Sequence, residues 1–465
     1  MPASYDMRAE GLGTLAVLPD RILVKIFTCL LKTDAKLLLP LSPVSKAFCA
    51  FVEEETLWKD LVIRRCAGDF TFKGSWKLTH FLPRNVFPPE PLKRIDVHDL
   101  NSDYLQRKWK ISNAPIGDYE ALPELSPGEA SFFRVDRRAN LSLEEFEREY
   151  AAKNRPVIIT DAIQHWPAWT SWTEKNLLKK LEGVSCRMDE VGPDGTKIHM
   201  TFSDYLQYAH NYHDDDPIYY FDPNFADKTP SLLDDYEIPE YFADDAFSLL
   251  DLDDRPYFRW IVIGPKRSGS PFHVDPFFTS AWNALFKGTK RWALYPPEAI
   301  PPGVKGYWGK RGNWKTINPP DPMEWYLFTY PAIQDTPLRP IECIQHPGDL
   351  IFIPSGWWHL VLNIEDTQIA VTQNFCNRFN FKNVYRDMHS DQGLLTLFTE
   401  TLLMERPDLM QMVNIPDFYY ERLRKKRKKE EKKRIKQLLK QQGANGNGHQ
   451  PKLPCLDLSN VSRDK

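Results

Sequence analysis

Several features are missing from this chain of 465 residues, and each absence excludes a class of protein. The seven cysteines are odd in number and scattered and form no Cys-x-x-Cys pair, so we expect reduced thiols and no structural zinc. No apolar run approaches the ~18 residues that a membrane span needs, and the N-terminus shows no basic stretch followed by an apolar core. We therefore expect a protein of the cytosol or nucleus, with no secretory signal and no membrane association.

Proline and aromatic residues are plentiful instead. The chain has 38 prolines, above the usual ~5%, together with 14 Trp, 19 Tyr and 27 Phe. This composition favours many turns and short strands over long helices. The length fits roughly three domains of about 150 residues each.

Charge is unevenly distributed along the chain. The net charge is −3, yet residues 422–436 hold eleven Lys or Arg and two Glu, a local charge of +9, so the remainder carries −12. The run Arg424–Lys429 fits a nuclear localisation signal, a nucleic-acid contact through residues 422–436, or a solvated charged helix. We predict a nuclear protein, with the cytoplasm as a further compartment, and the nucleic-acid contact stays open.

One of three His-x-Asp triplets indicates metal chemistry. Only His273 and Asp275 follow a strand-like run, Tyr257 to Ile263, and in a strand residues i and i+2 point to one face. Both side chains can therefore reach one ion. The other triplets lie in an acidic surface loop and at a helix start or turn: His213/Asp215 and His389/Asp391.

A third candidate ligand, His359, follows the turn Pro354–Gly356. We expect Leu350–Ile353 and Trp358–Leu362 to pair as a hairpin around this turn, with His359 on a short β-ribbon. One carboxylate and two imidazoles form the facial set that holds non-haem Fe(II) and leaves coordination positions open. Those open positions can accept a co-substrate and oxygen, so the pattern predicts an iron-dependent oxygenase.

A lysine shares one face of another predicted strand with apolar residues. Alternation places Lys290, Trp292 and Leu294 on one face. A lysine beside apolar side chains is unfavourable to bury unless an anion meets it. Lys290 therefore either extends into solvent or binds a negative group.

The segment Ile369–Phe375 offers polar groups for the same kind of site. Ala370, Thr372 and Asn374 share one face of this predicted strand. A hydroxyl and an amide beside apolar residues suit a polar ligand in an apolar pocket.

Residues 15–66 predict a small helical module. Apolar residues recur at helical spacing after Leu18-Pro19, and we expect two further helices to begin at Ser42-Pro43 and near Thr56. The segment resembles the F-box pattern over its full length, which implies docking to the Skp-type adaptor of a cullin-based ubiquitin ligase. The alternative is a three-helix cap with no such partner. The residues that carry the resemblance are Leu18-Pro19-Asp20, Ile26-Phe27, Leu41-Ser42, Val44-Ser45-Lys46 and Leu57-Trp58-Lys59.

From about Leu143 to Phe381 the chain resembles the jumonji-C family of Fe(II)/2-oxoglutarate oxygenases. The resemblance is strongest to the branch once called phosphatidylserine-receptor-like, described as arginine demethylases and lysyl hydroxylases. The stretches that carry it are Pro217–Asp222, Gly264–Ser270, Thr279–Leu285, Gly356–His359 and Thr372–Phe375.

That resemblance implies a role for each candidate site residue. His273, Asp275 and His359 would hold the iron. Lys290 and Thr372 would bind the distal carboxylate of 2-oxoglutarate, with O2 as the second co-substrate. Further cofactor contacts would come from Tyr219, Asn283, Asn374 and Ser270, the last standing where the branch usually has threonine.

The predicted fold is mainly β: a double-stranded β-helix (cupin or jelly roll) with flanking helices, preceded by a small all-α F-box module. We expect a tail at 1–14, the F-box at 15–66, an extended proline- and aromatic-rich connector at 67–130, the oxygenase domain at 131–395, C-terminal helices with the basic segment at 396–440, and a disordered tail at 441–465.

Two functions remain in competition. The first is a dioxygenase that demethylates arginine or hydroxylates lysine in a protein substrate, with histones and RNA-associated proteins as the suggested class. The second is a non-catalytic cupin that recognises substrates for a ubiquitin ligase. Turnover of 2-oxoglutarate to succinate distinguishes them.

Overall fold

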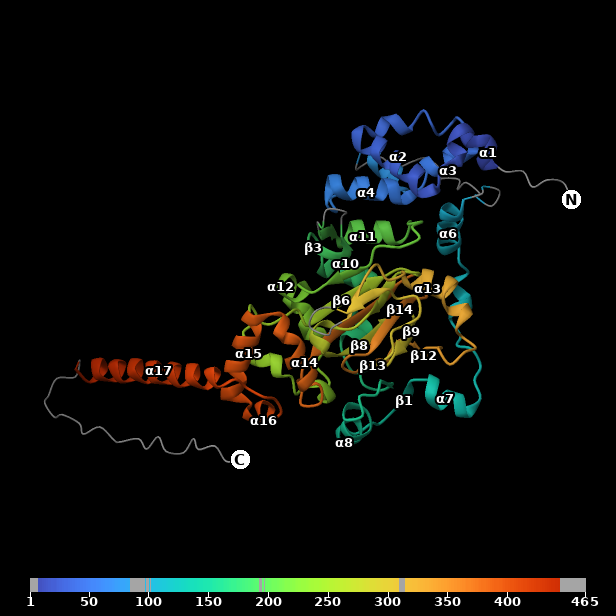
Figure 1. Cartoon of the computed structure of the whole chain (residues 1–465). Coiled ribbons are helices and arrows are strands. Elements are labelled where there is room, and N and C mark those ends of the chain that lie inside the picture. Colours follow the sequence, from blue (N-terminus) through green and yellow to red (C-terminus); the bar gives the residue numbers. More distant parts are fainter. Residues whose placement is uncertain are drawn as a thin grey trace. The chain divides into compact units, whose positions relative to one another are not determined.

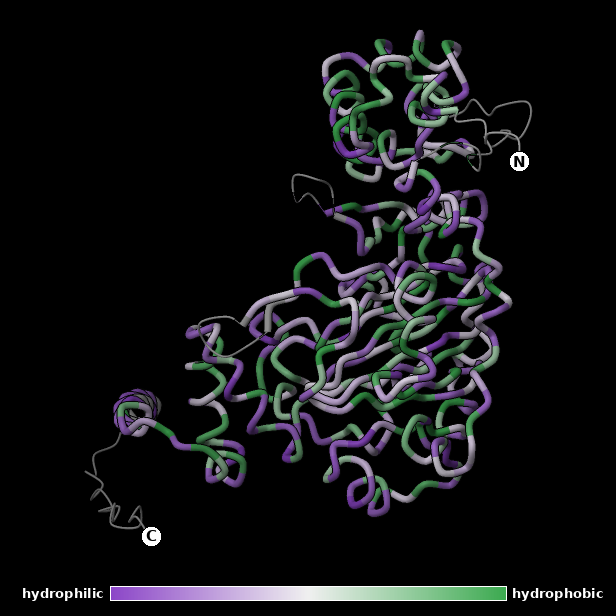
Figure 2. The backbone as a smooth tube through the Cα atoms, turned by 45° about the vertical axis from the view of Figure 1, so that its right-hand side comes forward, coloured by the Kyte–Doolittle hydropathy of each residue, from purple (hydrophilic) through white to green (hydrophobic). Residues whose placement is uncertain are grey.

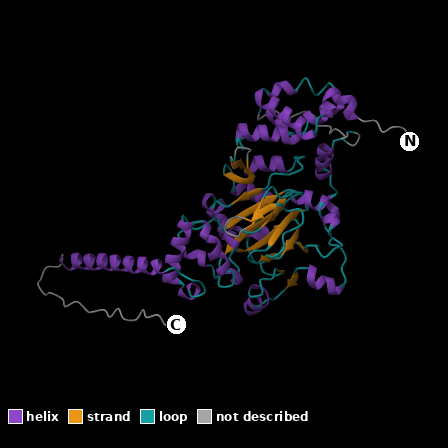
Figure 3. Ribbon diagram, viewed as in Figure 1, coloured by secondary structure: helices purple, strands orange, loops and turns teal. Residues whose placement is uncertain are grey.

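The computed structural model describes residues 7–83, 97, 100, 102–191, 195, 197–308 and 314–443. The chain divides into two units, Met1–Leu395 and Thr396–Lys465. In the first unit, strands gather in the middle and helices surround them (Figure 1, Figure 3). The predicted disordered tail falls outside the described residues except at 441–443, which end a helix.

Two sheets form the centre of the first unit. The larger sheet has nine strands in the order β1 (Asp136–Arg138), β2 (Val157–Ile159), β13 (Leu350–Ile353), β8 (Ser280–Lys287), β15 (Gln368–Phe375), β6 (Arg259–Gly264), β5 (Tyr220–Asp222), β3 (Ser185–Val191) and β4 (Lys197–Thr201). The smaller sheet has the order β12 (Ile341–Gln345), β9 (Lys290–Tyr295), β14 (Trp358–Asn363) and β7 (Gly269–His273). A separate hairpin joins β10 (Gly306–Trp308) to β11 (Trp314–Thr316).

The order of these strands confirms the predicted double-stranded β-helix. Strands β6, β8, β13 and β15 lie in the larger sheet, and β7, β9, β12 and β14 lie in the smaller one, so the chain crosses repeatedly between the sheets. The middle strands are buried along nearly their whole length, as in β8 and β14. Both faces of each strand are therefore covered, which explains their almost continuous apolar sequences.

The predicted hairpin of β13 and β14 is wrong. Strand β13 pairs with β2 and β8, whereas β14 pairs with β7 and β9. Gly356 in the turn between them has a φ of +78°, which carries the chain across to the other sheet. The sequence pattern showed two strands and a turn, but it did not show that the turn changes sheets.

Helices cover the sheets and fill the ends of the first unit. Phe146, the last residue of α8 (Leu143–Phe146), packs edge-on against Phe352 of β13 with a centroid distance of 5.0 Å. The helix continues as a π-helical segment. The other described α-helices of this unit outside the F-box and connector are α1 (Met7–Leu12), α9 (Ala168–Ser171), α10 (Glu174–Lys180), α11 (Phe202–Ala209), α12 (Phe225–Lys228), α13 (Pro322–Phe328) and α14 (Phe381–Asp387).

The F-box segment forms the predicted three helices, α2 (Asp20–Thr33), α3 (Lys46–Val52) and α4 (Glu55–Cys66). Two predicted starts are wrong by a few residues. Ser45, not Ser42, caps α3 by accepting a hydrogen bond from the amide of Phe48, and Glu54, not Thr56, caps α4. Several neighbouring polar residues can serve as an N-cap, so the sequence alone does not fix where each helix begins.

The expected extended connector at 67–130 is instead partly helical. It contains α5 (Trp76–Phe81), α6 (Asp103–Ser112) and α7 (Pro127–Phe133). Each helix begins after a serine whose side chain accepts a backbone hydrogen bond from the third helical residue, namely Ser75, Ser102 and Ser126. The segments 84–96, 98–99 and 101 of this connector lie outside the described residues.

The F-box and the barrel share one hydrophobic core. Phe27 and Trp58 of the F-box belong to the same buried cluster as Phe72, Tyr208 and Phe375. Directly after α4, Gly68 has a φ of +101°, and a Cβ added there would lie 1.9 Å from the carbonyl oxygen of His199 in β4. The backbone of the F-box module therefore approaches the barrel too closely for any side chain at this position.

The second unit contains most of α15 (Gln392–Glu405), α16 (Pro407–Met410) and α17 (Asp417–Gly443). Hydrophilic residues dominate α17, as Figure 2 shows. Among the described helices of the whole chain, none combines the length and apolar character that crossing a bilayer requires. The six cysteines in the described part of the chain form no disulfide with one another.

Candidate metal centre and adjoining cavity

The pairing of β7 with β14 brings two histidines together. His273 and His359 are register partners on these antiparallel strands, and their ring centroids lie 4.1 Å apart. A β-bulge follows His359 on β14, a feature common where a strand must aim a side chain into a site. Asp275 lies just beyond the end of β7, and its Oδ1 is 3.9 Å from Nε2 of each histidine.

These three side chains can hold one ion. Their candidate ligand atoms all lie within 4.8 Å of one another, and they form the sole group of three or more such residues in the described part of the chain. The donor set of two imidazoles and one carboxylate is that of non-haem Fe(II) sites. The His273 side chain is 40% exposed while that of His359 is 7% exposed, so the group opens to solvent on the His273 side.

Hydrogen bonds to backbone carbonyls orient both imidazoles. Nδ1 of His273 lies 2.8 Å from the carbonyl oxygen of Pro271, and Nδ1 of His359 lies 3.1 Å from that of Trp357. Because a carbonyl only accepts, each Nδ1 carries the proton and each Nε2 is left as the electron-pair donor. Burial, together with the neighbouring His273, lowers the pKa of His359 to about 4, which keeps its ring neutral and ready to bind a cation.

A strained turn follows the carboxylate ligand. Phe277 and Phe278 both have a φ of +55°, the left-handed region that non-glycine residues rarely adopt. Ser355 donates a hydrogen bond to the carbonyl of Phe278 at 2.6 Å, and Asn374 donates to the hydroxyl of Thr279 at 2.8 Å. These contacts hold the turn, and with it Asp275, against the sheets.

A cavity of about 240 Å³ adjoins the three ligands between the two sheets. Every cofactor contact expected from the sequence lines it: Tyr219, Ser270, Asn283, Lys290, Thr372 and Asn374. The cavity is smaller than the ~300–1,000 Å³ of sites for drug-sized ligands, so it suits a small acid and not a nucleotide-sized cofactor.

Lys290 supplies the positive charge of the cavity. Its side chain does not extend into solvent, since only 1% of the residue is exposed. Its Nζ donates a hydrogen bond to the hydroxyl of Tyr219 at 3.1 Å, and no carboxylate pairs with it among the described residues. Burial lowers the pKa of Lys290 to about 7. An unpaired buried amine of this kind fits a site for an anion.

The opposite wall, in the larger sheet, provides hydrogen-bonding groups. Thr372 and Asn283 are register partners on β15 and β8. The Asn283 side-chain oxygen accepts a hydrogen bond from Gln345 at 3.3 Å, which leaves its amide nitrogen as a donor. Thr372 donates its hydroxyl hydrogen to the carbonyl of Trp282 at 2.8 Å, so it must rotate before it can donate to a bound anion.

The remaining His-x-Asp triplets do not form a metal group. His213 and Asp215 lie in a loop, as expected. The expectation that the whole acidic run lies on the surface is wrong, because Asp214 between them is only 2% exposed. Asp391 accepts a hydrogen bond from the amide of Leu394 at the start of α15, as the helix-start context predicted.

Part of the cavity wall was not predicted from the sequence. Trp260 and Val262 of β6 line the cavity together with Phe221, whose ring centroid lies 5.6 Å from that of Trp260. The alternation of Trp260 and Val262 was available in the sequence, since residues i and i+2 of a strand share a face.

Comparison with known proteins agrees with this architecture. A cupin-like domain model matches residues 143–381, and an F-box-like model matches residues 15–64. The chain belongs to the jumonji-C family of cupin-fold oxygenases. Membership of this iron- and 2-oxoglutarate-dependent family explains why a triad of metal ligands and an anion cavity adjoin each other.

Several jumonji-C relatives cover most of this chain. Arginine-specific demethylase JMJ22 of Arabidopsis thaliana is 36% identical over 386 residues, covering 82% of this chain and 72% of the relative. Lysine-specific demethylase JMJ21 of the same plant is 40% identical over 82% of this chain, but the match spans only 39% of that longer protein. The bifunctional arginine demethylase and lysyl-hydroxylase psr-1 of Caenorhabditis elegans is 38% identical over 63% of this chain and 74% of its own length.

The low pKa of Lys290 predicts how the affinity for 2-oxoglutarate depends on pH. Above the pKa of about 7 the amine of the empty cavity is neutral, and a bound carboxylate favours the ammonium form, so binding must take up a proton. We expect the dissociation constant to be constant below this pH and to rise up to about tenfold per pH unit above it. Calorimetric titration of the Mn(II)-loaded protein from pH 6 to 9 measures this.

The variant Lys290→Arg provides the matched control. A guanidinium stays charged throughout this range, so the variant should lose the pH dependence whatever its affinity. An affinity of the natural protein that does not change with pH would contradict the assignment of Lys290 as the anion contact.

Proposed function

We propose that this chain is an Fe(II)/2-oxoglutarate-dependent dioxygenase that hydroxylates or N-demethylates side chains of a protein substrate, and that its F-box links it to a ubiquitin ligase. The observation that supports this most strongly is the adjacency of two sites. The three metal ligands and the unpaired buried Lys290 line one small cavity, which opens to solvent beside His273.

Each residue of the site has a role in this proposal. His273, Asp275 and His359 hold the ion, which when bound supplies oxidation of a C–H bond coupled to decarboxylation of 2-oxoglutarate. Lys290 neutralises the distal carboxylate of the acid. Asn283 and the hydroxyl groups of Tyr219, Thr372 and Ser270 donate hydrogen bonds to it. The apolar wall around Trp260 and Val262 excludes water from the stem of the acid.

A cationic side chain is the substrate that we propose. The names of the relatives describe arginine demethylases, a lysine-specific demethylase and a lysyl hydroxylase. The loop before β6 exposes Asp251, Asp253 and Asp254, six to nine positions before Trp260 of the cavity wall, and these carboxylates would complement a cationic substrate that reached them. Histones and RNA-associated proteins are the proposed class, since both are rich in arginine and lysine.

Release of succinate from 2-oxoglutarate tests the catalytic proposal. We expect the purified chain with Fe(II) to form succinate, and His273→Ala to reduce the rate at least about 100-fold, since even indirect disturbance of metal ligands costs 10–100-fold. His389→Ala, from a triplet outside the site, should keep the natural rate. Mass spectrometry of arginine- and lysine-rich peptides then identifies the product as a gained oxygen or a lost methyl group.

Equal background turnover by the natural chain and His273→Ala would leave the second function, substrate recognition by a non-catalytic cupin. The F-box supports a role in a ligase in either case. Its surface also exposes apolar side chains that do not pack into the core. Among them are Val17, which is 84% exposed, and Val44, which is 61% exposed. Exposed apolar residues gathered on one small module fit a partner surface.

The proposed docking of the F-box to a Skp-type adaptor depends on these side chains. Val44→Glu should weaken co-purification with the adaptor at least about tenfold, because a charge replaces an apolar contact at the interface. Leu338→Glu is the control, since Leu338 is equally exposed at 61% but lies outside the F-box. Equal capture of the natural chain and Val44→Glu, or no capture of either, would contradict this part of the proposal.

We also propose that the chain acts in the nucleus, with the basic helix α17 as the localisation signal. Its run Arg424–Lys429 lies within a described helix of hydrophilic sequence. Replacing these six residues by glutamine should move a fluorescently tagged chain to the cytoplasm. If nucleic-acid contact is the role of this helix instead, the same variant will stay nuclear and lose salt-sensitive binding to nucleic acid.

A further inference from the structure

One short segment, Asp214 to Tyr219, connects the F-box to the co-substrate cavity. Its first residues lie under helix α4 of the F-box, and its last residue lines the cavity. The segment is held at its start, its middle and its end by separate hydrogen bonds. These contacts tie the segment to the F-box at one end and to the wall of the cavity at the other.

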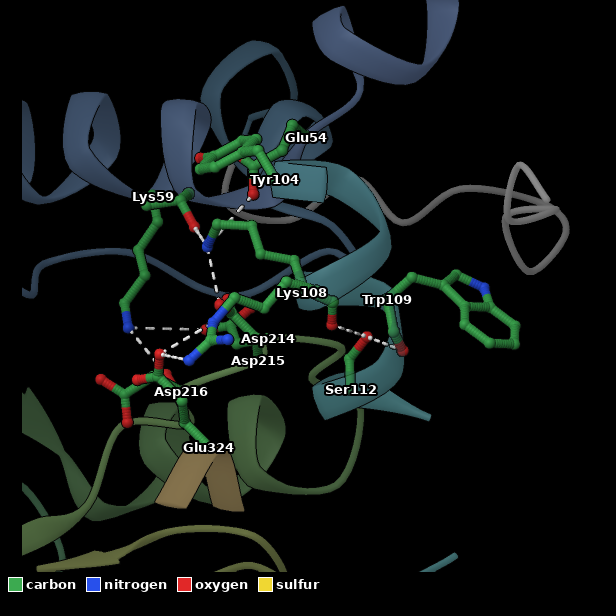
Figure 4. A network of polar contacts seen from close by, with 12 residues as sticks. Glu54, Lys59, Tyr104, Lys108, Trp109, Ser112, Asp214, Asp215, Asp216 and Glu324 are labelled. Carbon is green, nitrogen blue, oxygen red and sulfur yellow. Dashed lines mark hydrogen bonds and ion pairs between the residues drawn. The ribbon is translucent and has the colours of Figure 1, made fainter. Parts of the chain in front are cut away.

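The F-box holds the start of this segment through Lys59. Nζ of Lys59 donates a hydrogen bond to the carbonyl oxygen of Asp216 at 3.0 Å, lies 2.8 Å from the Glu190 carboxylate, and lies 3.7 Å from that of Asp214. Figure 4 shows the amine reaching from α4 to Asp214 and Asp216. Burial disfavours the charged amine, but Glu190 and Asp214 outweigh burial and raise the pKa of Lys59 well above its usual value.

A second lysine makes the same connection. Lys108 of α6 donates hydrogen bonds to Asp215 at 2.7 Å and to the hydroxyl of Thr56 at 2.6 Å, so it joins the segment to the start of α4 (Figure 4). The carboxylates of the segment therefore meet positive charges from the helices next to them. Asp214 and Asp215 each have a cationic partner within this interface.

The middle of the segment is fixed by one tyrosine. Tyr208 of α11 donates a hydrogen bond to Asp214 at 2.7 Å, and its hydroxyl oxygen accepts one from the amide of Ile218 at 2.9 Å. Trp76 also donates to Asp214, at 2.7 Å. A displacement of Asp214 is therefore transmitted through Tyr208 to the residue before Tyr219.

The end of the segment sets the position of Tyr219 in the cavity. Its amide donates a hydrogen bond to Asp189 at 2.8 Å, and Asp189 is the neighbour of Glu190, the partner of Lys59. The ring lies so close to β6 that a Cβ added at Gly264 would be 2.6 Å from it. The hydroxyl accepts the hydrogen bond of Lys290 inside the cavity.

We propose that Lys59 of the F-box is a positioning residue for the co-substrate: through the segment Asp214–Tyr219 it places the Tyr219 hydroxyl and Lys290 for binding 2-oxoglutarate. This inference rests on the function proposed above. It goes further because it makes the position of two co-substrate contacts depend on a residue of the F-box. A partner that shifts α4 on binding would then change the affinity for 2-oxoglutarate. Because linkage is reciprocal, bound 2-oxoglutarate would change the affinity for that partner by the same factor.

The test compares Lys59→Met with Lys59→Arg in the full chain. We expect Lys59→Met to raise the dissociation constant for 2-oxoglutarate about tenfold, measured by calorimetry on the Mn(II)-loaded protein, because it leaves Glu190 and Asp214 without their counter-charge. KM for 2-oxoglutarate should rise with little change in kcat, since the residue acts on binding. Lys59→Arg should restore most of the affinity, and Lys25→Met, an exposed lysine of α2, should match the natural chain.

A double-mutant cycle separates positioning from a general loss of stability. If Lys59 acts through Tyr219, its substitution adds little once Tyr219→Phe has removed the hydroxyl, so the two losses of affinity will not be additive. Additive losses, or an unchanged dissociation constant in Lys59→Met, would overturn the inference while leaving the enzymatic function intact. A natural chain that binds no 2-oxoglutarate would overturn both.

Glu190→Gln gives the same test in a milder form. The Glu190 side chain is 24% exposed, and its amide analogue keeps the shape while removing the charge that holds Lys59. If Lys59→Met does not fold, this variant is compared with the natural chain instead. A severalfold rise in the dissociation constant supports the inference, and no change contradicts it.

Discussion

The antiparallel pairing of β7 with β14 is the constraint on which the site depends. It sets His273 opposite His359, and the turn after β7 then places Oδ1 of Asp275 3.9 Å from Nε2 of each histidine. Because both strands belong to the smaller sheet, the backbone hydrogen bonds of the sheet fix the two histidines, whereas the turn after β7 fixes Asp275. A shift of register by one residue would turn one imidazole to the opposite face and destroy the group.

Two buried lysines, Lys59 and Lys290, differ in whether a carboxylate of the described chain neutralises their charge. Lys59 meets carboxylates on the neighbouring module, so its charge is satisfied within the folded chain. Lys290 has no carboxylate partner among the residues that the structure describes; its Nζ meets the Tyr219 hydroxyl, and its pKa falls towards neutrality. The first arrangement stabilises an interface. In the second arrangement, burial makes the charged form of Lys290 unfavourable, and a bound anion offsets this free-energy cost. The cavity therefore favours negative ligands.

The sequence predicted the metal ligands because their signal is local. His273 and Asp275 are two residues apart beside a strand, and the position of His359 after a Pro-Ser-Gly turn marks a second strand. Local patterns also predicted the strands around the site correctly. The F-box and the double-stranded β-helix were predicted from such patterns together with the resemblance to known families. What failed was pairing: β13 and β14 follow each other in sequence but lie in different sheets.

Contacts between residues that are far apart in the sequence could not be predicted from local patterns either. The acidic run around Asp214 has the composition of a solvated loop, and only the approach of α4 and Trp76 makes it an interior structure. The helices of the connector were missed because their serine caps are separated by proline-rich stretches that obscure helical periodicity. Thr279 gained its role only when folding brought it beside Asn374.

The shared core of the F-box and the barrel has an evolutionary consequence. Family boundaries drawn near residue 64 pass through a continuous hydrophobic interior, which includes Trp58 on one side and Tyr208 on the other. An F-box borrowed from another protein would bring neither the lysine that meets Glu190 nor the bare glycine that fits beside β4. Exchange of one module alone would therefore leave Glu190 without its cationic partner or place a side chain against the backbone of His199.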